Sequence, residues 1–397
     1  MSGSRYPSYQ TYDRPTFNQL PAHWRLMRGR HLVTIQTGSG DTADAEDTGD
    51  YPFYVRSDSP LRSSGWEFDT RAVLTAGDGA GVAKVFHLVS GKFMAHQRVY
   101  VLHDFREVTP EFFFYAFKSM FHLLALDGSA KSTVDSVRRH MIADMPFGIP
   151  PLDEQRAIAD YLDHETAQID VLVVKQQELL SLLAERKRSV LDGVLADVGG
   201  EACRLRWMYR PSSEANKPDE EVLSVYRDHG VIPKSSRSDN FNKTPENVDR
   251  YLLVRPNDLV VNKMKAWQGS LGISAHRGIV SADYEVLRPI SEDLDPAFAH
   301  FLLRSPRMTH EYRVRSRGIR PSQWRLYWQD LADIEISVPP LPEQRCAASH
   351  IKAEASAIDA LIAKAEEHIA LAKERRSALI TAAVTGQIDV RTSRKAS

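Results

Sequence analysis

The strongest constraint on the fold is a segment that occurs twice in the chain. Ile149–Arg156 (IPPLDEQR) recurs 189 positions later as Val338–Arg345 (VPPLPEQR). Upstream, Ile142–Met145 aligns with Leu331–Ile334 at the same offset. The agreement continues downstream without a gap at Ala159/Ala348, Glu165/Glu354, Ile169/Ile358, Asp170/Asp359, Leu172/Leu361, Lys175/Lys364, Glu178/Glu367, Leu182/Leu371, Glu185/Glu374 and Arg186/Arg375. A chain that repeats a unit of this length folds as two related halves.

Each copy predicts a long helix, because apolar residues recur every seven positions, with others three positions later. This pattern is typical of a helix that buries one stripe against another helix. The first series is Leu162, Ile169, Gln176, Leu183 and Val190 with Leu172 and Leu179, and the second is Ile351, Ile358, Ala365, Ala372 and Leu379 with Leu361. Gln176 and His368 interrupt the stripe. We expect the two helices to pack as an antiparallel coiled coil.

The ends of both helices have matching signals. Pro150–Pro151 and Pro339–Pro340 keep the chain extended just before each helix. Gly199–Gly200 and Gly386 follow the last turns, where a left-handed residue commonly terminates a helix. From Asp153 to Ala196 a continuous helix would be about 65 Å long.

The regions before the two helices predict mixed α/β domains, because short β-type runs there are followed by a helix. The strand-like runs are 71–75, 98–102, 258–261 and 283–287, and the helical segments are 110–126 and 296–304. The predicted class is α+β, with two such domains alternating with two long helices in pseudo-twofold arrangement. The predicted boundaries are a disordered N-terminus 1–20, domains 21–148 and 200–337, helices 149–199 and 338–390, and a disordered tail 391–397.

Composition excludes several functional classes. Lys and Arg number 51 and Asp and Glu number 52, so the chain as a whole has no basic field, although local basic patches stay open. No apolar run approaches the roughly 18 residues that a membrane span needs, so no membrane association is expected. Cys203 and Cys346 have neither zinc-site nor disulfide-framework spacing. We expect a cytoplasmic protein without a metal.

The two PPL-x-EQ segments, Pro150–Gln155 and Pro339–Gln344, each opening a heptad helix, resemble the specificity subunit of type I restriction–modification systems. Leu259–Ser270 is also similar to a segment of that family's target recognition domains. The resemblance extends over nearly the whole chain. A single such segment would be weak, but two with matching helices are specific.

The resemblance implies a subunit without chemistry of its own. Two target recognition domains would each read half of an interrupted double-stranded DNA sequence, and the helices would set the spacing and dock two methyltransferase subunits. Those partners would hold S-adenosylmethionine, so no cofactor is expected in this chain. Separate restriction and motor subunits would join through the complex.

Basic residues near loops are the candidate DNA contacts. The densest basic stretch contains Arg313, Arg315, Arg317 and Arg320, which suit phosphate or guanine if they do not form a salt-bridged surface. Lys263 and Lys265 alternate after a strand-like run, while Trp267 beside them favours core packing. In the first half, Lys131, Arg138 and Arg139 occupy the corresponding region, and Lys84, Lys92 and Arg98 are weaker candidates.

Four residues shared by the two helix starts are candidates for partner binding. They are Glu154, Gln155, Glu343 and Gln344. A glutamate in the first turn also has a purely local explanation, because it complements the positive end of the helix dipole. Contact with a neighbouring domain is the other interpretation for the glutamines.

Two other motifs are better explained by local structure than by a functional site. Gly77–Gly81 resembles a nucleotide-binding loop, but a strand-like run follows it, so a hairpin turn is predicted. The acidic residues of 41–50 lack His or Cys and predict a solvated loop. An enzyme is disfavoured because adenine-methyltransferase and phosphate-loop signatures are missing. The alternative to a DNA-specificity subunit is a non-catalytic protein-binding scaffold with duplicated recognition domains.

Overall fold

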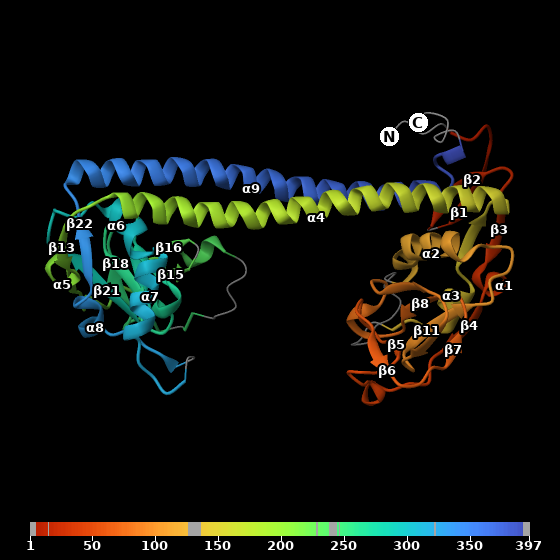
Figure 1. The fold of residues 1–397 in the computed structure, drawn as a ribbon, viewed down its shortest axis with the longest axis horizontal. Coiled ribbons are helices and arrows are strands. Elements are labelled where there is room, and N and C mark those ends of the chain that lie inside the picture. Colours follow the sequence, from red (N-terminus) through yellow and green to blue (C-terminus); the bar gives the residue numbers. More distant parts are fainter. Residues whose placement is uncertain are drawn as a thin grey trace. The chain divides into compact units, whose positions relative to one another are not determined.

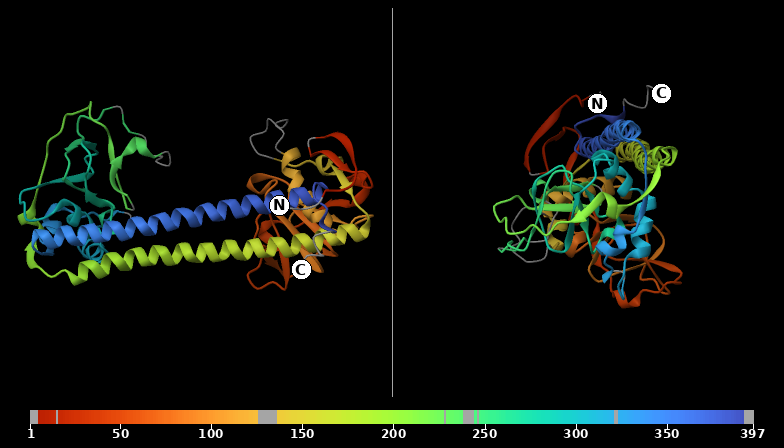
Figure 2. Two further views of the ribbon diagram at one scale, coloured as in Figure 1. Left: turned by 90° about the horizontal axis from the view of Figure 1, so that it is seen from above. Right: turned by 90° about the vertical axis from the view of Figure 1, so that its left-hand side faces the viewer.

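A computed structural model describes residues 5–14, 16–125, 136–227, 229–237, 244–245, 247–320 and 323–391. The chain divides into two compact units, unit 1 with residues 1–177 and 367–397 and unit 2 with residues 178–366. The long helices α4 (Leu152–Asp197) and α9 (Leu341–Val384) are continuous through the boundary between the units (Figure 1 and Figure 2). Each unit therefore consists of one globule and a part of each long helix.

The two long helices run antiparallel within each unit. In unit 1 the Arg376 Nε atom lies 2.9 Å from Asp170 Oδ1, and in unit 2 the Lys187 Nζ atom lies 2.6 Å from Asp359 Oδ1. These four residues are repeat equivalents, since Asp170 corresponds to Asp359 and Lys187 to Arg376. The two ion pairs are thus the same contact, formed once in each unit.

The predicted helix seam is confirmed in one series and wrong in the other. Most of the residues that recur every seven positions are buried, namely Leu162, Ile169, Leu183, Ile351, Ile358, Ala365, Ala372 and Leu379. By contrast, Leu172, Leu179 and Leu361, three positions later, are 46%, 41% and 51% exposed. A pair of helices covers only a narrow stripe on each, so the second series remains on the flank.

The globule of unit 1 is built on a four-stranded sheet with the order β4-β11-β8-β9. A second sheet has the order β6-β5-β10-β7, and β3 pairs with β12 beside the helix start. The strands are β3 (Arg25–Arg28), β4 (Thr34–Thr37), β5 (Tyr51–Tyr54), β6 (Leu61–Ser63), β7 (Phe68–Asp69), β8 (Ala72–Ala76), β9 (Phe86–Val89), β10 (Lys92–Ala95), β11 (Val99–His103) and β12 (Pro146–Ile149). The helices are α1 (Gly29–Leu32), α2 (Pro110–Ala125) and α3 (Arg139–Ala143).

The globule of unit 2 repeats the main sheet of unit 1 and the strand pair beside the helix start. Its main sheet has the order β14-β21-β18-β19, β13 pairs with β22, and β15-β16 and β17-β20 form two ribbons. The strands are β13 (Glu201–Arg204), β14 (Tyr209–Pro211), β15 (Leu223–Tyr226), β16 (Gly230–Pro233), β17 (Leu252–Val254), β18 (Leu259–Asn262), β19 (Leu271–Ile273), β20 (Gly278–Val280), β21 (Tyr284–Pro289) and β22 (Glu335–Val338). The helices are α5 (Leu205–Met208), α6 (Pro296–Leu303), α7 (Pro306–Arg315) and α8 (Trp328–Ala332).

The predicted strands and helices of the globules are confirmed to within a few residues. The Phe-rich helix α2 buries Phe112, Phe113, Phe117 and Phe121 in the core of unit 1. Gly77–Gly81 lies between the antiparallel strands β8 and β9 and contains a 3-10 turn, not the helix that a nucleotide-binding loop requires. Helix α7 was not predicted, although Ser305 caps it and Pro306 begins it.

The prediction of a disordered N-terminus is wrong for the described residues 5–14 and 16–20. Strands β1 (Tyr9–Arg14) and β2 (Phe17–Pro21) form an antiparallel hairpin. Tyr6, Phe17 and Leu20 are buried in the core of unit 1, together with the last turns of α9. Burial of these side chains supplies the driving force that orders the segment.

The C-terminal tail is ordered as far as Arg391, and the predicted tail residues 392–397 lie outside the described residues. The long helices begin three residues later than predicted, after the proline pairs, and end at Asp197 and Val384. Across the described ranges, none of the helices combines the length and apolar character needed to cross a membrane.

Candidate nucleic-acid interface

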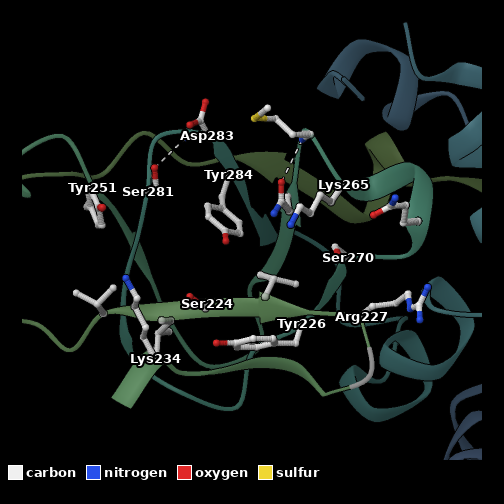
Figure 3. Close-up of a pocket in the computed structure, with 16 residues that line it drawn as sticks. Ser224, Tyr226, Arg227, Lys234, Tyr251, Lys265, Ser270, Ser281, Asp283 and Tyr284 are labelled. Carbon is white, nitrogen blue, oxygen red and sulfur yellow. Dashed lines mark hydrogen bonds between the residues drawn. The ribbon is translucent and has the colours of Figure 1, made fainter. Parts of the chain in front are cut away.

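An open groove with a volume of about 640 Å³ lies in the globule of unit 2 (Figure 3). Three tyrosines, three cationic side chains and several amide and hydroxyl groups line it. They include Tyr226, Tyr251, Tyr284, Arg227, Lys234, Lys265, Asn262, Gln268, Ser224, Ser270, Ser281 and Asp283. Aromatic faces beside cations and amides are the combination that contacts bases, sugars and phosphates of nucleic acids.

Two walls position these side chains. Tyr226, Arg227 and Lys234 come from the β15–β16 hairpin and its continuation, and Tyr284 and Lys265 come from the opposite wall (Figure 3). That wall is formed by the end of β18, the following turn and the start of β21. At the edge of this wall, Met264 N donates to Asn262 Oδ1 at 3.1 Å.

The electrostatics of the groove favour an anionic ligand. Lys265 is exposed, and Lys234 Nζ donates to Thr244 Oγ1 at 2.7 Å. Burial raises the pKa of Tyr284, so its hydroxyl stays a neutral hydrogen-bonding group at physiological pH. Asp283 is the acidic residue among the groove residues and lies 3.9 Å from Arg325.

Of the two predicted lysines, the structure brings only Lys265 into the groove. Lys263 is largely buried, and its Nζ atom donates to Ala282 O at 2.8 Å and lies 3.9 Å from Glu285. Burial raises the pKa of Glu285, and the charge of Lys263 partly offsets this. Lys263 therefore stabilises the strand pair and is a poor candidate for DNA contact.

The predicted arginines lie on α7 and the loop after it. Arg315 pairs with Glu311 one turn earlier, and Arg317 pairs with Asp330. Arg313 and Arg320 are exposed and have no ion-pair partner among the described residues. This loop adjoins the end of β18, because Leu326 N donates to Lys263 O at 2.9 Å. Arg313 and Arg320 remain candidates for DNA contact, whereas Arg315 and Arg317 are tied to carboxylates.

The corresponding loop of unit 1 contacts the same strand end. Val137 N donates to Gly77 O at 2.7 Å, directly after β8, and Ser136 forms a bridge with Asp78. Arg138 and Arg139 are exposed beside this contact. Lys131 lies outside the described residues. Val137 and Leu326 are 189 positions apart, so the predicted correspondence of the two loops is confirmed for this contact.

A further set of charged groups in this corner of unit 1 was only partly recognised in the sequence. Asp78 pairs with Arg56 and with Arg98, and the sequence pointed to Arg98 alone as a weak candidate. Arg56 belongs to a loop after β5, and no local pattern connects it with β8 or β11. The groove tyrosines were missed for the same reason, because they come from three separate segments.

The two shared glutamines bind within the chain. Gln155 accepts from Thr109 N at 2.7 Å and donates to Glu107 O and Pro150 O, each at 2.9 Å. Gln344 forms the same network, accepting from Asp295 N at 2.8 Å and donating to Asp293 O and Pro339 O. Both side chains are fully buried. They join each long helix to its own globule, so they offer nothing to a partner subunit.

The glutamates differ between the two helix starts. Glu154 is buried and accepts from the Tyr6 hydroxyl at 2.6 Å and from Trp24 Nε1 at 3.0 Å, and it lies 2.8 Å from His23 Nε2. Arg391 of the tail is 3.6 Å away. Glu343 is exposed instead. Glu154 therefore fixes both terminal segments, and only Glu343 stays a candidate for partner binding.

Comparison with known proteins agrees with this architecture. Residues 21–181 match the family model described as type I restriction modification DNA specificity domain. The matched part of the chain is therefore similar to this family. The matched residues contain most of the first globule and about two thirds of α4, and the second globule repeats the main sheet and the strand pair at the helix start.

Individual proteins similar to this chain cover most of its length. It is 25% identical to the type I restriction enzyme EcoDI specificity subunit of Escherichia coli, across 82% of this chain and 80% of that protein. A structure solved in work on complex assembly and conformational transition of the type I R-M system has a TM-score of 0.65, with 17% identity, 93% coverage of this chain and 99% of that one. The HsdS subunit from Thermoanaerobacter tengcongensis is 19% identical with a TM-score of 0.49, covering 93% and 98% of the two chains.

Proposed function

We propose that this chain is the DNA-specificity subunit of a type I restriction–modification enzyme. Each globule is a target recognition domain that reads one half of an interrupted double-stranded DNA target. The observation that supports this most is a duplicated fold of the specificity family, with different side chains at the same corner of each copy. Two copies with the same corner chemistry would read a palindrome, whereas these two read different half-sites.

The DNA-facing surface that we propose is the corner at the ends of β8 and β18. In unit 2 it contains the groove with Lys265 and, next to it, the loop with Arg320. In unit 1 it contains Arg98, Arg138 and Arg139. A single bidentate contact discriminates by only about 1–3 kcal/mol, so one globule is weakly selective. Two globules in one chain add their discrimination over a single duplex.

We also propose that the long helices dock two methyltransferase subunits. In unit 1, Leu172 and Leu371 are 46% and 54% exposed and line an apolar groove of about 240 Å³ with His368. In unit 2 their repeat equivalents Leu361 and Leu182 are 51% and 63% exposed. Exposed leucine patches of this kind mark protein contact surfaces. Two equivalent patches fit two copies of one partner.

In this assignment the chain performs no chemistry. S-adenosylmethionine binds the methyltransferase subunits, restriction and motor subunits join through the complex, and the assembly works in the cytoplasm, where the DNA lies. The alternative of a protein-binding scaffold differs in its response to salt, because DNA binding releases counterions from phosphates.

The test is the affinity of the chain, assembled with its methyltransferase subunit, for a fluorescent DNA duplex between 50 and 200 mM salt. We expect affinity to fall by a factor of roughly 10³–10⁵ if six to ten phosphates are contacted. The methyltransferase subunit alone is the control and should bind with a shallower slope. A complex that binds duplex DNA no better than this control would reject the assignment and favour a scaffold.

A further inference from the structure

Two arginines share one carboxylate at the DNA-facing corner of unit 1. Arg56 donates to Asp78 Oδ1 at 2.7 Å and Arg98 donates to Asp78 Oδ2 at 2.5 Å. Burial raises the pKa of Asp78, but the hydrogen bonds and charges of both arginines outweigh it, so this pKa lies below its ordinary value. The Asp78 side chain is 18% exposed, whereas those of Arg56 and Arg98 are 41% and 58% exposed. The arginines therefore keep free N–H donors at the surface.

The backbone beneath Arg98 is also fixed. Arg98 N donates to His96 Nδ1 at 3.0 Å, and Arg98 O accepts from Gly77 N at 2.7 Å. His96 is buried, and its backbone N–H donates to Tyr54 O at 3.0 Å. Exposed arginines ordinarily lose considerable rotamer freedom when they bind. Here the main chain and Asp78 have already restricted that freedom.

The strand registers place Asp78 and Arg98 where unit 2 has its groove. In unit 1 Ala76 pairs with Val99, and in unit 2 Asn262 pairs with Tyr284. Two residues past Ala76 is Asp78, and two past Asn262 is Met264. One residue before Val99 is Arg98, and one before Tyr284 is Asp283. Met264 and Asp283 both line the groove, so the same corner carries different chemistry in the two units.

We propose that Arg98 and Arg56, oriented by Asp78, form the guanine-reading site of the first recognition domain. This inference rests on the proposed function. A guanidinium presents a rigid planar fork that matches the O6 and N7 acceptors of guanine in the major groove. One Nη atom of each guanidinium is bonded to Asp78, and the exposure of both arginine side chains leaves their other donors accessible. The ligand is thus the major-groove edge of a G·C pair in one half-site.

Nearby acidic residues favour a base edge over a phosphate as this ligand. Gln97, next to Arg98, donates to Asp41 Oδ2 at 3.0 Å, and Asp41 begins the exposed acidic loop of residues 41–50. A phosphate at this position would meet the repulsion of those carboxylates as well as that of Asp78. The edge of a guanine is neutral, so these carboxylates do not repel it. The amino group of the paired cytosine can donate a hydrogen bond to a carboxylate.

The experiment uses the full chain in complex with its methyltransferase subunit. Methylation rates are measured on a set of duplexes in which each base pair of both half-sites is varied in turn. The variants are Arg98→Ala, Arg98→Lys and Arg56→Ala. The control is Arg71→Ala, because Arg71 forms a surface ion pair with Glu111 at 2.6 Å, with 42% side-chain exposure, at the other end of β8.

We expect Arg98→Ala and Arg56→Ala to reduce discrimination at one G·C position roughly 5- to 150-fold, with the other half-site unchanged. Arg98→Lys keeps the charge but not the fork, so it should lose the same discrimination. If Arg98→Ala does not fold, Arg98→Lys provides the test of the guanine-reading site. Arg71→Ala should match the wild type. Equal weakening on all duplexes would overturn the proposal in favour of a phosphate contact, and unchanged profiles would overturn it too.

Failure of the proposed function gives a different result. In that case the wild-type complex itself would methylate without any preference for a two-part sequence. If the wild type is selective for such a sequence and the arginine variants keep its full profile, only the guanine assignment is wrong.

Discussion

The two globules share the topology of their main sheets, but they differ in the exposed side chains at the ends of β8 and β18. The equivalent sheets β4-β11-β8-β9 and β14-β21-β18-β19 and the networks of Gln155 and Gln344 are the same in both units. At the ends of β8 and β18, unit 1 has two arginines on a carboxylate, and unit 2 has a groove lined by tyrosines and lysines. The buried contacts therefore keep the same fold in both globules, whereas the exposed side chains at this corner differ and can bind different ligands.

The largest effect is expected from shortening both long helices together. Removing residues 174–180 and 366–372 keeps the pairings of Asp170 with Arg376 and Lys187 with Asp359. Seven residues of helix span roughly 10 Å, or about three base pairs. If the helices set the spacing of the half-sites, the spacer of the methylated motif should change in length. Sequencing of modified adenines measures this, and an unaltered motif would refute the spacing role.

The two leucine patches should each account for one methyltransferase subunit. We expect the double variant Leu172→Asp and Leu371→Asp to lower the number bound from two to one, because charged side chains there oppose burial. The pair Leu361→Asp and Leu182→Asp should do the same in unit 2. Native mass spectrometry counts the subunits, and Gln168→Asp on the exposed surface of α4 is the control. Two subunits retained in both double variants would place the docking surface elsewhere.

Acid should destabilise unit 2 through a residue that unit 1 lacks. His300 and Phe114 are both the fifth residue of their helices, counted from Pro296 and Pro110. Burial and the charge of Arg304 lower the pKa of His300 to about 4. An unfolded histidine titrates near 6.5, so the unfolded state binds the proton first as the pH falls. Stability is therefore retained above pH 6.5 and lost between 6.5 and 4, by roughly 3 kcal/mol.

The measurement for His300 is the free energy of unfolding from urea titrations at pH 7 and pH 4. The variant His300→Gln should flatten the difference between the two conditions relative to the wild type, since glutamine does not titrate. An identical pH dependence in both proteins would show that His300 is protonated without cost in the folded state.

The helix-start glutamates give a smaller contrast between the units. Glu154→Gln should lower the free energy of unfolding by about 2 kcal/mol, because the buried carboxylate bonds to Tyr6 and Trp24 and lies near His23 and Arg391. Glu343→Gln alters an exposed side chain and should cost less than about 0.5 kcal/mol. Chemical denaturation of both variants checks this. Equal losses would mean that the terminal segments do not depend on Glu154.

The smallest effect concerns the two lysines after β18. Lys265→Ala should weaken binding to all duplexes and lower the salt slope by about one, as loss of one phosphate contact does. Lys263→Ala should leave the slope unchanged and reduce stability instead, because its Nζ atom is bonded to Ala282 O. Binding isotherms at several salt concentrations separate the two, and the reverse ranking would contradict the position of the interface.

Periodic and local signals predicted much of the fold from the sequence. The seven-residue recurrence and the Pro and Gly boundaries indicated α4 and α9, and β-type runs indicated β8, β11, β18 and β21. The hairpin of β1 and β2 was missed because its order depends on contact with the end of α9, more than 350 positions away. Leu172 is exposed because the contact between the two long helices is narrow. The spacing of apolar residues in the sequence does not reveal the width of that contact.

The site was less predictable than the fold. A basic run in the sequence does not reveal that Glu311 and Asp330 already bind Arg315 and Arg317. The groove gathers side chains from β15, β18, β21 and the turns between them, which only the folded sheet brings together. Asp78 joins Arg56 and Arg98 across separate segments for the same reason.

We propose that each globule reads its own half of one DNA target. The most direct measurement is single-molecule sequencing of modified adenines in DNA from cells that express this chain with its methyltransferase partner. The chain is expressed as the wild type, as Arg98→Ala and as Arg320→Ala. We expect one interrupted, non-palindromic motif, with Arg98→Ala relaxing one half and Arg320→Ala relaxing the other. A single uninterrupted motif, or both variants altering the same half, would contradict it.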